Sequence, residues 1–120
     1  MSNENLKLRT KQFALRVIKL VESLPPDTTS NVIGRQLLRS GTSVGANYRA
    51  ACRSKSSADF ISKMGTVEEE ADELGYWMEL LVDAGKVKPL KISELIKEAG
   101  ELTAIAVGSI NTARKSATRR

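Results

Sequence analysis

The strongest constraint on the fold is a heptad repeat of apolar residues in the middle of the chain. The repeat consists of side chains spaced alternately four and three residues apart: Phe60, Met64, Val67, Ala71, Leu74, Met78 and Leu81. This spacing lines up one apolar stripe along a helix and favours packing against neighbouring helices at about 20°. The repeat therefore predicts a long helix over 57–85 that packs into a helical bundle.

Three further segments carry apolar stripes with the helical period, and they predict helices over about 9–24, 30–53 and 93–113. Pro25 and Pro26 would end the first helix, while Gly85 and Pro89 separate the last two. A basic tail over 114–120 is expected to be frayed. Four helices with short connections predict an all-α fold, an antiparallel up-down-up-down four-helix bundle that forms one domain over 1–120.

The segment SGTSVGAN at 40–47 contains few good helix formers. It is compatible with a kink or a loop, or with a continuous helix whose small residues let a neighbouring helix approach closely. We favour the continuous helix, begun by a cap at Thr29 or Ser30. Ser56 and Asp59 resemble a capping box at the start of the next helix, with Asp in place of Glu.

Composition excludes several classes of function. The chain has one cysteine and no histidine, which removes a disulfide framework, the usual zinc ligands and the usual general base. No apolar run approaches the roughly 18 residues that span a bilayer, and the first residues lack the apolar core of a signal peptide. We therefore expect a cytoplasmic protein that is not an enzyme, has no cofactor or metal and does not enter a membrane.

Charge is unevenly distributed along the chain, whose net charge is +5. Residues 1–57 hold ten Lys and Arg against three Asp and Glu, residues 58–85 hold one against eight, and residues 86–120 hold eight against three. This asymmetry indicates a polyanionic partner, self-association between opposite patches, or both.

The predicted second helix carries an arginine stripe: Arg35, Arg39, Arg49 and Arg53 lie within about 40° of one line, opposite its apolar face. Arginine binds phosphate through two parallel hydrogen bonds, so such a row suits a nucleic-acid backbone. The alternative is an ordinary solvated face, or one paired with an acidic neighbour. The candidate nucleic-acid-binding residues are these four arginines together with Lys7, Arg9, Lys11 and Arg16.

The acidic run at 68–73 could bind Mg²⁺ or form a polar face, and Glu69, Asp72 and Glu73 would be its ligands. A second ligand cluster is missing, so a salt contact with arginines of a neighbouring subunit is the better interpretation. Cys52 beside Ala51 is interpreted as a small buried residue.

Residues 102–113 contain no charged side chain, which is unusual for a surface helix. The side opposite the apolar stripe is instead small and uncharged, which indicates an interface between copies of the chain. The candidate interface residues are Gly100, Ala104, Val107, Gly108 and Asn111, with Tyr76 and Trp77 from the third helix.

The stretch at 36–65, QLLRSGTSVGANYRAACRSKSSADFISKMG, resembles the 23S rRNA intervening-sequence protein family of bacterial four-helix-bundle proteins. The matching core residues are Gln36, Leu37, Arg39, Ser43, Val44 and Asn47. LeuPro at 24–25 and Phe60 at the head of the third helix also fit, and the resemblance extends over about 9–112. The family's Glu-Gly after the core is replaced by Ala50 and Ala51, so no role of that glutamate carries over.

The resemblance implies a small bundle that assembles into a ring, typically a homopentamer. It also implies similarity to the accessory variability determinant of diversity-generating retroelements, which binds nucleic acid and a reverse transcriptase. Members are often encoded inside rRNA genes or described as ribosomal, without an established activity.

Residues and resemblance together predict a non-enzymatic oligomeric bundle that binds nucleic acid, with structured RNA favoured over DNA. The rival prediction is a protein-binding scaffold, an accessory factor of a polymerase or ribosomal complex. A metal-dependent nuclease using the 68–73 carboxylates is the third and weakest alternative.

Overall fold

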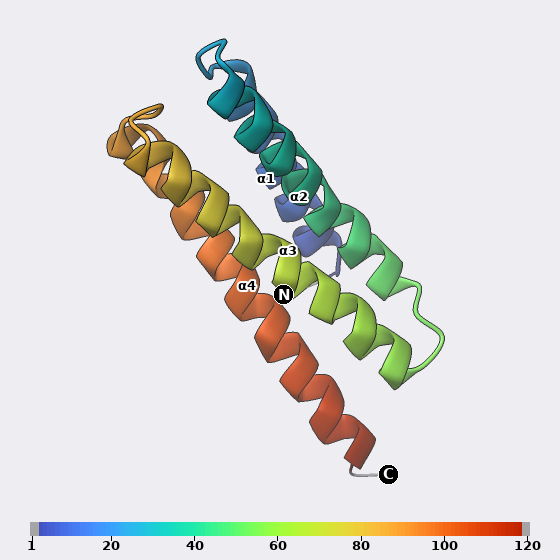
Figure 1. Cartoon of the computed structure of the whole chain (residues 1–120). Coiled ribbons are helices and arrows are strands. Elements are labelled where there is room, and N and C mark those ends of the chain that lie inside the picture. The colour runs from blue at the N-terminus through green and yellow to red at the C-terminus, as the bar shows by residue number, and fades with distance from the viewer. Residues whose placement is uncertain (1–2, 119–120) are drawn as a thin grey trace.

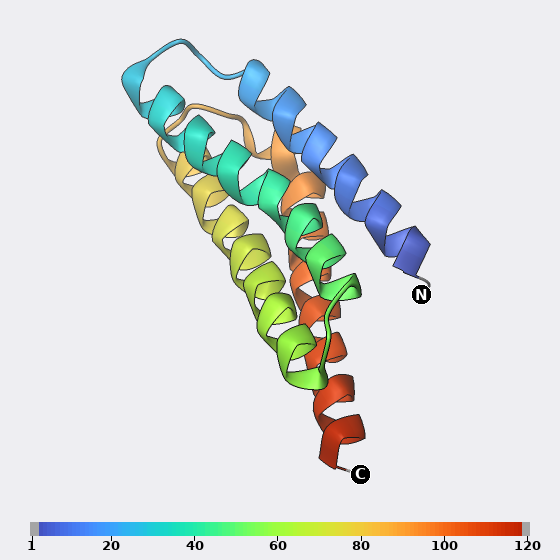
Figure 2. The same cartoon turned by 90° about the vertical axis from the view of Figure 1, so that its right-hand side faces the viewer.

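The computed structural model describes residues 3–118, which form four helices. These are α1 (Asn3–Glu22), α2 (Thr28–Cys52), α3 (Ser57–Asp83) and α4 (Pro89–Thr118). The chain turns back at each of its three connections, so that consecutive helices lie side by side in an elongated body of 53 × 22 × 20 Å (Figures 1 and 2). The prediction of an all-helical chain with four helices is confirmed for the described residues.

The core lies along the axis of the body and is built from the predicted stripes. On α3, all of the heptad side chains from Met64 to Leu81 are buried, and Phe60 packs against their edge. On α2, the predicted face from Ile33 to Ala51 is buried as well. Burial of these stripes provides the main driving force for packing the helices together.

The helices do not contact one another equally. α3 packs extensively against both α2 and α4, and α1 packs mainly against α2. The contact of α1 with α4 is small, so α1 is held chiefly from one side (Figure 2). α4 is the longest helix, and its last turns extend beyond the ends of the neighbouring helices (Figure 1).

Helix starts differ from the predictions in ways that local chemistry explains. α1 begins at Asn3 rather than near Arg9, because Leu6 continues the apolar stripe and is buried. α2 is capped by Asp27, not by Thr29 or Ser30: the Asp27 carboxylate accepts a hydrogen bond of 2.8 Å from the Ser30 amide, and Ser30 itself is buried. α4 begins at Pro89 rather than near Ser93, since proline suits a first helical position whose N–H needs no partner.

Helix ends differ less. α1 ends at Glu22 rather than Leu24, before the two prolines. Gly85 has φ +72° and follows the end of α3, as expected for a left-handed C′ residue. The segment 114–118, predicted to be frayed, continues α4 as a helix; its basic residues suit the negative end of the helix dipole. The last two residues of the predicted tail, 119–120, lie outside the described part.

Ser56 caps α3 as predicted, accepting a hydrogen bond of 3.0 Å from the Asp59 amide. In a capping box the Asp59 carboxylate would also accept a hydrogen bond from the Ser56 amide. Here it accepts one from the preceding amide, that of Lys55, at 3.2 Å.

α2 runs unbroken through 40–47, which confirms the continuous helix. Its glycines allow α1 to lie close against it. A Cβ added at Gly41 would stand 2.8 Å from Val17 Cγ1, and one at Gly45 would stand 3.1 Å from Thr10 Oγ1.

Candidate nucleic-acid interface

The exposed side of α1 and α2 is basic and almost free of acids. α2 contains no Asp or Glu along its whole length, and α1 has none between Glu4 and Glu22. Among the predicted binding residues, six are exposed: Lys11, Arg16, Arg35, Arg39, Arg49 and Arg53. The structure brings cations of both helices together here, although Arg16 lies on the other side of α1, in a groove shared with Lys91 and Glu94 of α4.

A groove of about 340 Å³ runs between α1 and α2 on this basic face. We call it the α1–α2 groove; its lining residues are Lys7, Thr10, Lys11 and Ala14 from α1 and Thr42, Gly45, Ala46 and Arg49 from α2. On each helix these positions follow the i, i+3, i+4, i+7 spacing of a single face. The groove is therefore built from two helical turns of each helix.

The chemistry of the α1–α2 groove is that of an anion site. Lys7 and Lys11 stand on one wall and Arg49 on the other, with no carboxylate among the lining residues. Small side chains leave the space between the cations open, and Gly45 contributes no side chain at all. Lys7 also lies 3.5 Å from Glu4, an exposed pair that contributes little.

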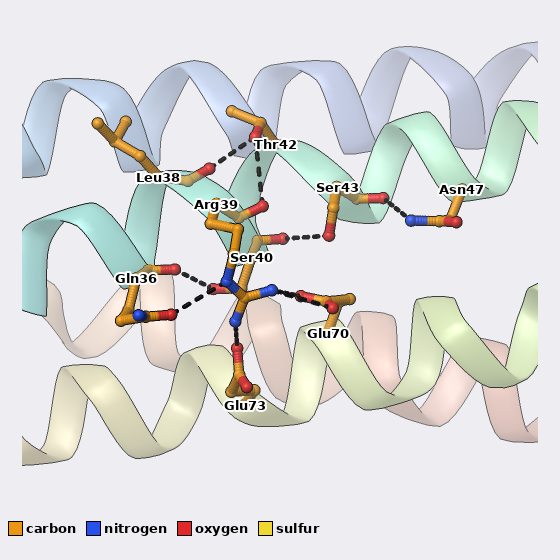
Figure 3. Close-up of polar contacts among 9 residues, drawn as sticks. All are labelled: Gln36, Leu38, Arg39, Ser40, Thr42, Ser43, Asn47, Glu70 and Glu73. Carbon is orange, nitrogen blue, oxygen red and sulfur yellow. Dashed lines mark hydrogen bonds and ion pairs between the residues drawn. The ribbon is translucent and has the colours of Figure 1, made fainter.

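Arg39 does not stand free in the arginine stripe. Its guanidinium donates to the Glu70 carboxylate at 3.0 and 3.2 Å and to Glu73, while its Nε donates to Gln36 at 3.0 Å (Figure 3). From the sequence, the carboxylates at 68–73 were expected to pair with arginines of a neighbouring subunit. The structure instead forms this pair within one chain, where it ties α2 to α3.

Arg9 is likewise engaged within the chain. It forms two hydrogen bonds of 2.7 Å with Glu98 and lies 3.6 Å from Glu101. Hydrogen bonding from Arg9 lowers the pKa of Glu98 below its ordinary value, against the opposing effect of burial. Because α1 and α4 have little other contact, this ion pair is the main polar link between them.

The predicted oligomer interface is exposed in the single chain. Gly100, Ala104, Val107, Gly108 and Asn111 all lie on the open side of α4. Tyr76 is 55% exposed, and its ring meets that of Trp77 edge-on at a centroid distance of 5.2 Å. Trp77 differs from the other candidates because much of it packs against the core.

Two further sequence hypotheses can be placed. Within residues 3–118 no group of three or more Asp, Glu or Cys side chains is arranged to hold a metal ion. Cys52 is half-buried rather than fully buried. Burial, followed by a hydrogen bond with Cys52, raises the pKa of Tyr48 far above its ordinary range.

Sequence reasoning missed the groove itself and the two acidic partners on α4. Ala14, Thr42 and Ala46 could have been found as small residues at helical spacing beside the charged positions, whereas Thr10 lies on the buried face of α1. Glu98 and Glu101 carried no such signal, because their meeting with Arg9 depends on residues 89 positions apart coming together.

No helix within the described residues is long and apolar enough to cross a membrane. The fold and the basic face define the chain as a small all-α protein with a charged helical surface.

Comparison with known proteins identifies the family to which the chain belongs. The model of the 23S rRNA-intervening sequence protein family matches residues 5–108, and the chain belongs to that family. Its structure is similar to the crystal structure of a protein of unknown function from the S23 ribosomal protein family of Bacteroides thetaiotaomicron. That similarity has a TM-score of 0.85 and 32% sequence identity, and covers 92% of this chain and 99% of the other. No curated protein matches the sequence.

Proposed function

We propose that this protein is a non-enzymatic, oligomeric four-helix bundle, with its helices alternately up and down, that binds nucleic acid through the basic face of α1 and α2. The observation that carries the proposal is the α1–α2 groove, where three cations from two helices converge without an acid among the lining residues. Membership of a family named for an intervening sequence of 23S rRNA supports structured RNA over DNA as the partner.

The residues of the proposed interface are fewer than the sequence pattern indicated. Lys7, Lys11, Arg35, Arg49 and Arg53 form it, whereas Arg16 borders a separate groove with Lys91 and Glu94 of α4. Arg9 and Arg39 instead hold neighbouring helices together through ion pairs. Binding through such cations is electrostatic, weakly sequence-specific and steeply weakened by salt.

The experiment is fluorescence anisotropy of a labelled hairpin RNA, and of duplex DNA of equal length, over a salt series. We expect log affinity to fall linearly with log salt, and RNA to bind more tightly than DNA. A variant with Arg35, Arg49 and Arg53 all changed to glutamine should bind more weakly and with a shallower slope.

The matched control changes Lys88, Lys91 and Lys97 to glutamine, which removes the same charge from exposed positions around and on α4. Equal losses in the two variants would mean that net charge alone governs affinity and would contradict the basic face as the site. Absence of binding even at low salt would favour the protein-scaffold alternative, which a pulldown resistant to nuclease would then test.

The oligomeric part of the proposal rests on the open side of α3 and α4. Gly65, Gly75, Gly100 and Gly108 lie inside these helices, and a Cβ added at any of them would meet no atom within 4 Å. Each glycine costs the helix about 1 kcal/mol relative to alanine, and packing within the chain does not require it. Close approach of a second copy would account for them.

Size-exclusion chromatography with light scattering tests the assembly, for which family resemblance implies a pentamer. Ala104→Arg should lower the measured mass, because a long charged side chain would enter the covered face. Asn31→Arg adds the same charge at an exposed position of α2 and should leave the mass unchanged. A monomeric wild-type chain at micromolar concentration would contradict the oligomer.

A further inference from the structure

The placement of the aromatic side chains bears on what form of nucleic acid the basic face can hold. The chain contains two phenylalanines, two tyrosines and one tryptophan. Phe13 and Tyr48 are buried, and Phe60 and Trp77 pack against the core. The remaining aromatic residue, Tyr76, is exposed but belongs to α3, between acidic neighbours.

The basic face of α1 and α2 therefore offers no aromatic ring on which a base could stack. Proteins that hold single strands without sequence preference combine a basic groove with such rings, and each stacked base contributes about 1–3 kcal/mol. This face has the charge without the stacking surface. A single strand would gain only phosphate contacts there and would lose conformational freedom in making them.

The cations are arranged in a straight line along rigid elements. Arg35 on α2 and Arg53, the residue that caps the C-terminus of α2, are separated by about 27 Å at the helical rise of about 1.5 Å per residue. Arg49 lies between them at the α1–α2 groove, opposite Lys7 and Lys11. A double helix presents its phosphates as a stiff, regular array, so it meets a fixed row of cations without being ordered first. Double-stranded RNA is recognised largely by this shape and its backbone.

We propose that the ligand of the basic face is double-stranded RNA, and that backbone phosphates of the duplex sit in the α1–α2 groove between Lys7, Lys11 and Arg49. This inference rests on the proposed function and specifies its ligand. The small side chains of Ala14, Thr42 and Ala46 leave the groove open to a phosphate, and the adjoining arginines engage phosphates on either side.

The test compares a labelled duplex RNA of about 20 base pairs with oligouridine of the same length by fluorescence anisotropy over a salt series. We expect the duplex to bind at least about ten-fold more tightly than oligouridine. The slope of log affinity against log salt should be steeper by about 0.9 for each phosphate that the protein contacts. Lys11→Gln combined with Arg49→Gln should reduce the slope for the duplex by about 2.

A second variant blocks the groove without removing a cation. Ala46 is exposed, so Ala46→Glu leaves the core intact while placing a carboxylate between the groove cations. It should weaken duplex binding at least as much as the loss of one cation. The control, Lys88→Gln with Lys97→Gln, should leave the slope within experimental error of wild type. Circular dichroism confirms that each variant is helical.

The outcomes separate this inference from the function on which it rests. Oligouridine binding as tightly as the duplex would overturn the double-stranded ligand but leave nucleic-acid binding standing. Duplex binding that both groove variants leave unchanged would overturn the groove as the phosphate site. If neither RNA binds at low salt, the proposed function fails together with the inference.

Discussion

Replacing Gly41 by alanine is expected to destabilise the protein, although alanine is the better helix former. Alanine gains about 1 kcal/mol from helix propensity. Against this, the new Cβ would stand 2.8, 3.0 and 3.1 Å from Cγ1, Cγ2 and Cβ of Val17, which is completely buried. A β-branched side chain in a helix is largely confined to one rotamer, so Val17 cannot turn away.

Overpacking of this kind costs about 1–3 kcal/mol, and contact with a side chain's own Cβ argues for the upper part of that range. The net loss should be about 1–2 kcal/mol. At about 4 °C per kcal/mol for a chain of this size, the melting temperature would fall by about 4–8 °C. Urea unfolding followed by circular dichroism at the helical band measures the free energy directly.

One comparison isolates the cause. Val17→Ala removes the two methyl groups that the Cβ introduced by Gly41→Ala would strike. The double variant should therefore lose less free energy of unfolding than the two single losses added together, by about 1–2 kcal/mol. A Gly41→Ala protein as stable as wild type, or additive single changes, would refute the close-packing argument.

Three further predictions concern polar contacts. The hydrogen bond from Arg9 lowers the pKa of Glu98, so its stabilising effect is present above the ordinary value of 4.5 and is lost as pH falls through the lowered pKa. At neutral pH the free energy of unfolding of the wild type should therefore exceed that of Glu98→Gln by about 1 kcal/mol. This difference should disappear in strong acid. A difference that stays the same at every pH in urea titrations would contradict the prediction. Arg39→Gln should change RNA affinity less than about two-fold, because its ion pairs already occupy it, whereas Arg49→Gln should weaken binding several-fold in the same anisotropy assay. Ser56→Ala removes the α3 cap and should cost about 1 kcal/mol, while Ser56→Gly should cost only a few tenths, as thermal unfolding can check.

Much of the fold could be predicted because periodicity is a local property of the sequence. The α3 heptad and the α2 face each identified buried residues correctly from spacing alone. The boundaries were less accurate where two local signals competed. At the start of α2, three residues could serve as a cap, and the carboxylate of Asp27 was the one whose geometry allowed it.

The candidate site was only partly predictable, for a related reason. Helical spacing showed which cations share a face, and all four arginines of the stripe are exposed there. Spacing on one helix does not reveal what a neighbouring helix places opposite. Arg39 has the same periodic position as the others, yet it lies beside Glu70 of α3 and is engaged.

The sequence by itself determined that the chain is helical, which side of each helix is buried, and that positive charge belongs to α1 and α2 while negative charge belongs to α3. These properties follow from residue order within a few turns. The tertiary structure alone decided which cations remain available, because ion pairs join residues far apart in the chain, such as Arg9 with Glu98. It also decided where a groove opens, since the α1–α2 groove is lined by residues of two helices that approach closely at Gly45 and Thr10.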